Sequence, residues 1–162
     1  MIGRFASLRS DERGGSVVEL ALAAPFLCAL VVGMTDISRA YAMKLRLAQA
    51  AQRTIESIQV NGRNTNNYTG LAAEAAAAAT AAGYTGSTVA VNYMLECNGA
   101  ASSSNTTGAA INTTCNSGQT YARYVTVTIS NTYTPMFATS YFPGANANGT
   151  VNVSGYAGLR VQ

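Results

Sequence analysis

Side chains that commonly carry out catalysis are scarce in this chain. The sequence contains no histidine, so the commonest general base and metal ligand is missing. The only lysine, Lys44, lies in a stretch with helical periodicity and is a poor candidate for a serine–lysine dyad. Glu56, Glu74 and Glu96 are far apart in sequence, and no local pattern pairs them as acid and base. We therefore expect a protein that is not an enzyme and that uses no cofactor.

The three cysteines divide into one isolated residue and one pair. Cys28 lies within an apolar run, where a free cysteine behaves as a small hydrophobic residue. Cys97 and Cys115 flank a polar segment and could close it with a disulfide, which would indicate an oxidising compartment outside the cytoplasm. A zinc site is the alternative, but two thiols without a histidine or further cysteines nearby provide too few ligands.

A carboxylate at the head of an apolar run is the most unusual feature of the sequence. From Leu20 to Met34 no residue is charged, and Glu19 stands directly before this run. Placing an ionised acid in hydrocarbon costs at least about 2.5 kcal/mol, so we expect Glu19 to be paired or functional. Pro25 lies inside the run, where a helix loses one backbone hydrogen bond. Residues 17–35 are just long enough to cross a membrane, since a spanning helix needs about 20 residues.

The residues around Glu19 resemble a prepilin signal. Gly14 is followed by Gly15-Ser16-Val17-Val18 and then by Glu19-Leu20-Ala21-Leu22-Ala23-Ala24-Pro25. A glycine five residues before a glutamate that opens an apolar helix is similar to the processing and assembly signal of type IV-like prepilins. The longer pattern, with its alanine–leucine pair and proline, resembles the TadE-like pseudopilins, or minor pilins, of bacterial tight-adherence (Tad/Flp) systems. Leu20, where an aromatic residue is commoner, and the doubled glycine depart from the family pattern.

This resemblance implies a protein that is a substrate and a building block. A dedicated aspartic prepilin peptidase would cut after Gly14 and leave Gly15 as the new amino terminus, and a cut after Gly15 is the alternative. Glu19 and Pro25 would belong to the assembly helix. The implied partners are the peptidase, the major pilin, other pseudopilins, the inner-membrane assembly platform and membrane lipid. The implied role is in tight-adherence pilus assembly or secretion.

Two other hypotheses fit the same residues. A pseudopilin of another secretion apparatus would carry a similar signal. A signal-anchored binding domain outside the cytoplasm would use the apolar helix as a plain anchor, so its length would be unchanged and Glu19 would be dispensable. A cleaved secretory signal fits less well, because no small-residue cleavage site follows the apolar run.

The resemblance and the cysteine pair, more than the distribution of charge, predict the location of the protein. The formal net charge of +3 is too small and too scattered to indicate a nucleic-acid partner. Arg4, Arg9 and Arg13 favour a leader that stays in the cytoplasm, although further cations follow the apolar run. We expect a single-pass protein of the inner (cytoplasmic) membrane with its C-terminal domain outside the cytoplasm. The resemblance adds incorporation into an extracellular pilus.

The chain is expected to have four parts. These are a leader (1–14), a transmembrane and assembly helix (15–35), an amphipathic stalk helix (36–60) and an extracytoplasmic α+β domain (61–162). The two helical parts are predicted to form one helix from about Val17 to Val60. Three- and four-residue spacing predicts one apolar face of the stalk, made of Ile37, Tyr41, Leu45, Ala48, Ile55 and Ile58. The other face carries Arg39, Arg46, Gln49, Arg53 and Glu56.

The outer domain is predicted to hold one short helix and a small antiparallel sheet, in a pilin-like α+β fold. The alanine-rich stretch 71–82 has the composition of a helix. Apolar residues alternate with polar ones near 89–95, 121–133 and 151–161, as in half-buried strands. The short helix and the end of the stalk are the expected covers for the apolar face of this sheet.

Two polar loops interrupt the strands. The segment from Asn98 to Asn116 is expected to be mobile unless it is tied down. The loop from Thr139 to Thr150 contains Tyr141-Phe142-Pro143-Gly144, whose aromatic side chains could form a contact patch. Isolated aromatic residues on a surface are the commoner case.

Overall fold

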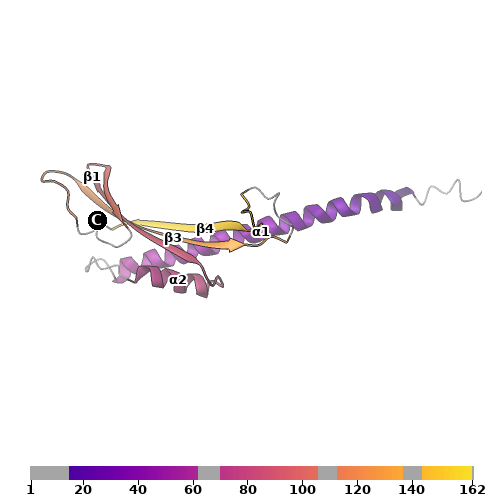
Figure 1. Cartoon of the computed structure of the whole chain (residues 1–162), viewed down its shortest axis with the longest axis horizontal. Helices are drawn as coiled ribbons and strands as arrows, with labels where there is room; N and C mark the ends of the chain where they lie inside the picture. The colour runs from indigo at the N-terminus through magenta and orange to yellow at the C-terminus, as the bar shows by residue number, and fades with distance from the viewer. Residues whose placement is uncertain (1–14, 62–69, 106–112, 137–143, 162) are drawn as a thin grey trace, which may run out of the picture. The chain divides into compact units, whose positions relative to one another are not determined.

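The computed structural model describes residues 15–61, 70–105, 113–136 and 144–161 (Figure 1). Its helices are α1 (Gly15–Asn61) and α2 (Leu71–Ala81). Its strands are β1 (Thr88–Cys97), β2 (Ala100–Asn105), β3 (Tyr121–Tyr133) and β4 (Val151–Arg160). The expected α+β fold, with a long N-terminal helix, a short helix and a small antiparallel sheet, is confirmed. The chain divides between Ser38 and Arg39 into two compact units.

Helix α1 is continuous through its apolar and amphipathic parts. It contains Pro25, which has no N–H, so the carbonyl of Ala21 lacks its usual partner within the helix. Alanine and leucine, both good helix formers, are frequent on either side of the proline. The helix is long and apolar enough to cross a membrane, which fits a single-pass anchor.

The sheet has the strand order β2-β1-β3-β4, and every neighbouring pair is antiparallel. Strand β3 pairs without a break with Thr88–Cys97 on one side and with Val151–Arg160 on the other. Val125, Val127 and Ile129 of β3 are fully buried, while the residues between them are only half-buried. The bounds of β1, β3 and β4 confirm the three strands that were predicted from the period of two.

Strand β2 is a correction to the sequence prediction. It lies inside the segment from Asn98 to Asn116, which we expected to be a loop. Asn98 and Gly99 join β1 to β2 as a two-residue turn, because Cys97 pairs with Ala100. Both turn residues have positive φ, 51° and 78°, as the tight hairpin turn favoured by Asn-Gly requires. The Asn-Gly pair after an alternating strand is therefore the signal that could have predicted this hairpin.

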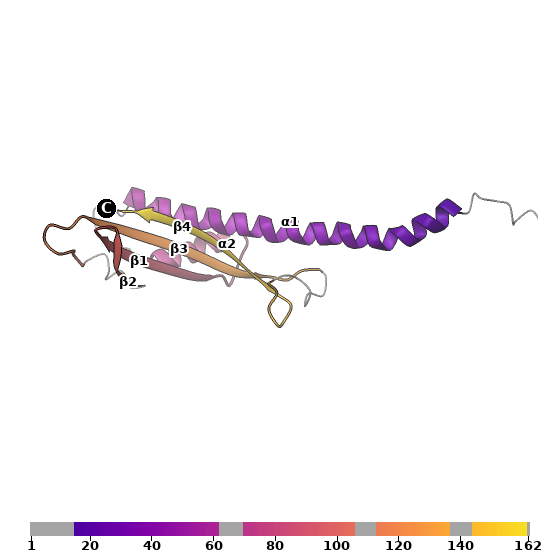
Figure 2. The same ribbon diagram turned by 90° about the horizontal axis from the view of Figure 1, so that it is seen from above.

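The core lies between the helices and one face of the sheet. Figure 2 shows α2 and the C-terminal part of α1 beside the sheet. Many of the helical core residues are alanines, which let the helix backbones come close to the strands. The core consists of Met43, Leu47, Ala50, Ala51, Ile55 and Ile58 from α1, Leu71, Ala75 and Ala79 from α2, and Val91, Tyr93, Val125, Val127, Ile129, Val153 and Ala157 from the strands.

The predicted apolar face of the stalk is partly wrong. Ile55 and Ile58 are buried as expected, but Ile37, Tyr41 and Leu45 are 60%, 61% and 48% exposed. The side of α1 that packs on the sheet is instead centred on Leu47 and its neighbours. Apolar residues surround most of the stalk, so periodicity alone could not show which side meets the sheet. The sheet packs against the side where Gly155 of β4 meets the backbone of Leu47 and Ala48.

Candidate functional site

The first turns of α1 carry the residues of the predicted processing and assembly signal. Gly14 lies outside the described residues, and Gly15 is the first residue of the helix. Glu19 follows Gly15 by about one helical turn, so the two residues lie on the same side of α1. The Glu19 side chain is exposed, and no described residue forms a hydrogen bond or an ion pair with it. Its carboxylate is therefore accessible from the surroundings of the helix.

The apolar part of α1 exposes large hydrophobic side chains around its whole circumference. No described residue of the first compact unit buries them. Such a helix requires lipid or other apolar helices as its surroundings. The exposed side chains are Val17, Val18, Leu20, Leu22, Phe26, Leu27, Leu30, Val31 and Met34. Pro25 and the free thiol of Cys28 are exposed on the same segment.

The predicted Cys97–Cys115 disulfide is confirmed. The two Cα atoms are 5.7 Å apart, and the bond joins residues 18 positions apart in sequence. Nearby polar contacts hold the same segment. The Asn98 Oδ1 atom accepts hydrogen bonds from the Thr120 N–H and hydroxyl, at 3.0 Å and 3.2 Å. The Arg123 guanidinium donates to the Thr113 carbonyl at 3.1 Å.

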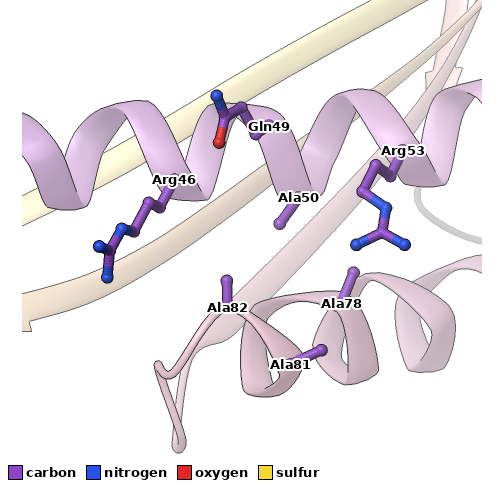
Figure 3. Close-up of a pocket in the computed structure, with 7 residues that line it drawn as sticks. All are labelled: Arg46, Gln49, Ala50, Arg53, Ala78, Ala81 and Ala82. Atoms are coloured by element: carbon purple, nitrogen blue, oxygen red, sulfur yellow. The ribbon is translucent and has the colours of Figure 1, made fainter.

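A groove with basic side chains lies between α1 and α2 (Figure 3). Its volume is about 270 Å³. Arg53 extends from α1 toward α2, Arg46 extends to the same side of α1 but past the end of α2, and Gln49 points away. The remaining lining residues are all alanines, namely Ala50, Ala78, Ala81 and Ala82. The sequence placed both arginines on the polar face of the stalk but did not indicate the groove, because α2 forms its second wall.

Asp36 is a buried acid that the sequence marked only as the start of the amphipathic stretch. It is 1% exposed, and a carboxylate buried to this extent requires polar partners. Its spacing along α1 to the buried residues Met43, Leu47 and Thr54 is a sum of three- and four-residue steps. That spacing is the signal that could have placed Asp36 on the packed side of the helix.

Two further points from the sequence concern the aromatic loop and a metal site. Tyr141 and Phe142, which could have formed a contact patch, lie outside the described residues. Within the described ranges, no three histidine, cysteine, aspartate or glutamate side chains gather as metal ligands would.

Comparison with known proteins gives one match, in the N-terminal part of the chain. The family model for TadE-like proteins matches residues 14–55, from the predicted signal into the amphipathic part of α1. The resemblance found in the sequence is therefore confirmed. No curated protein and no solved structure matches the chain.

Proposed function

We propose that this chain, whose residues 14–55 match the TadE-like family, is a minor pilin of a tight-adherence pilus. At the level of the family, the match supports a minor pilin related to this system. The finer proposal is that a prepilin peptidase cuts the chain after Gly14 and that the processed protein joins pilus assembly. One observation supports it: Glu19 is exposed in the first turns of an unburied apolar helix, four residues after Gly15.

The proposed location follows from the helix and the disulfide. The apolar segment of α1 provides a single membrane anchor. Disulfides persist in oxidising compartments, so the Cys97–Cys115 bond supports a C-terminal domain outside the cytoplasm. The proposed membrane is the inner membrane. There the leader can face a peptidase site in the cytoplasm while the disulfide-bonded domain lies outside the cytoplasm.

The proposed role is structural. Each exposed apolar side chain between Val17 and Met34 is a contact site for lipid before assembly and for neighbouring helices after it. The major pilin, other pseudopilins and the inner-membrane assembly platform are the proposed partners of this segment. In this scheme the chain contributes packing surface and register, and no chemical step.

Photo-cross-linking in piliated cells tests this function. A photoreactive amino acid at Leu30, 47% exposed on the apolar segment, should form adducts with pilin subunits. The same group at Tyr156, 62% exposed on the outer domain, is a control of similar exposure. Inactivating the prepilin peptidase should abolish the Leu30 adducts. Adducts with lipid alone, in cells that assemble pili, would show a plain anchor and contradict the proposal.

A further inference from the structure

We infer that the groove between α1 and α2 is a docking site for an acidic α-helix of another protein. Arg46 and Arg53 stand along this groove, seven residues apart on α1. Seven residues of an α-helix make about two turns and a rise of about 10 Å, so both guanidinium groups lie on the same side of α1. The inference concerns the outer domain and holds whether or not the chain is part of a pilus.

The positive charge of Arg46 and Arg53 favours an anionic partner in the groove. Neither Arg46 nor Arg53 forms a hydrogen bond or an ion pair with any described residue. Between Asp36 and Glu56, α1 carries cations and no carboxylate. The one carboxylate of α2, Glu74, lies in the first turn of that helix, whereas the groove is lined by its last residues. Guanidinium groups bind carboxylates through paired hydrogen bonds, so side-chain carboxylates are the matching ligands.

The shape of the groove favours a partner that is an α-helix. Its floor consists of Ala50, Ala78, Ala81 and Ala82, none of which extends beyond Cβ, so a backbone can approach closely. An amphipathic helix that lies along such a groove presents one face at regular spacing. Two glutamates seven residues apart on that helix repeat with the same rise as Arg46 and Arg53 and can meet both.

The charge pattern of α1 also disfavours a second copy of this chain as the partner that binds in the groove. The amphipathic part of α1 carries Arg39, Lys44, Arg46 and Arg53, and its acids are Glu56 and the buried Asp36. Two such helices side by side would bring cations together, and like charges in contact disfavour a pair. The geometry therefore points to a different polypeptide that carries an acidic helix.

Binding of designed peptides to the full-length protein in detergent micelles tests this inference. The probe is a fluorescein-labelled, alanine-rich helical peptide with two glutamates seven residues apart, and its control has glutamines instead. Fluorescence anisotropy should show binding of the glutamate peptide only. Arg46→Gln or Arg53→Gln should each weaken binding about tenfold at low salt, since each removes a charge-assisted pair. Lys44→Gln removes the same charge from an exposed site outside the groove and should leave the affinity within about twofold of the original.

A variant that fills the groove separates docking from long-range attraction. Ala81 is exposed, and Ala81→Phe should block the floor and weaken peptide binding without changing the net charge. Equal binding of the glutamine peptide, or an equal effect of Lys44→Gln, would overturn the inference. Tighter binding of an extended, proline-containing peptide with glutamates three residues apart would overturn the helical occupant. Displacement of the peptide by equimolar inorganic phosphate would show a simple anion site instead.

Discussion

Gly155 of β4 lies directly against the backbone of Ala48 in α1. A Cβ atom at Gly155 would overlap the Ala48 nitrogen and the carbonyl group of Leu47. Both partners at this contact are main-chain atoms, which cannot rotate away as a side chain can. Glycine at this one position therefore sets how closely the helix approaches the sheet.

Gly155→Ala is expected to destabilise the outer domain by at least about 2 kcal/mol, because overpacking against a fixed backbone forces the elements apart. Gly158→Ala is the matched control on the same strand. Its Cβ would approach the Tyr156 hydroxyl at 2.9 Å, but Tyr156 is 62% exposed and can move aside. Chemical denaturation followed by circular dichroism compares the two variants. Equal losses of stability in the two variants would show that the contact at Gly155 does not restrict how the helix packs on the sheet.

The disulfide is expected to stabilise the end of the sheet. On the chain-entropy model, a bond that closes a loop of this length contributes about 3 kcal/mol. Replacing Cys97 and Cys115 together with serine should lower the free energy of unfolding by roughly that amount, whereas Cys28→Ser should leave it unchanged. Peptide mapping without reduction should recover the linked pair. Alkylation of both thiols in native protein would contradict the bond.

Much of the fold could be predicted from the sequence because the signals are local. The alternation around Val125 and the unbroken apolar run after Glu19 follow from side-chain periods alone. The sheet-facing side of α1 could not be predicted in this way, because Leu45 and Leu47 are equally apolar. Only the approach at Gly155, which lies far away in sequence, distinguishes the two. The groove beside Arg46 could not be predicted either, because α2, which is distant in sequence, forms one of its walls.

Removal of the leader is expected to leave a protein of residues 15–162. The position of Glu19 relative to Gly14 matches the spacing of prepilin signals, which places the cut before Gly15. Amino-terminal sequencing and intact mass of the protein from the membrane fraction measure this directly. A strain without the peptidase is the control and should retain Met1. A mature chain that still begins at Met1 in the presence of the peptidase would refute processing.

Glu19 is expected to be required for assembly and dispensable for membrane insertion. A helix that enters hydrocarbon does not need a carboxylate, and an apolar residue at this position would insert more readily. Cleavage creates an amine at Gly15, about one turn before Glu19, in every subunit. An amine from an adjacent subunit can neutralise Glu19 and fix the axial register of the helices. Leaving one partner of such a buried pair alone typically costs about 3–5 kcal/mol.

The test compares Glu19→Ala and Glu19→Gln with Glu56→Gln, which removes an exposed carboxylate from the same helix outside the apolar segment. Three quantities are measured for each variant: the amount in the membrane, the fraction cleaved and the incorporation into the pilus or its assembly complex. We expect near-normal membrane level and cleavage for all three variants. Incorporation should be lost in both Glu19 variants and retained with Glu56→Gln, because only the former lose the carboxylate next to the apolar segment. If Glu19→Ala is incorporated like the original protein, pairing of this carboxylate does not set the register.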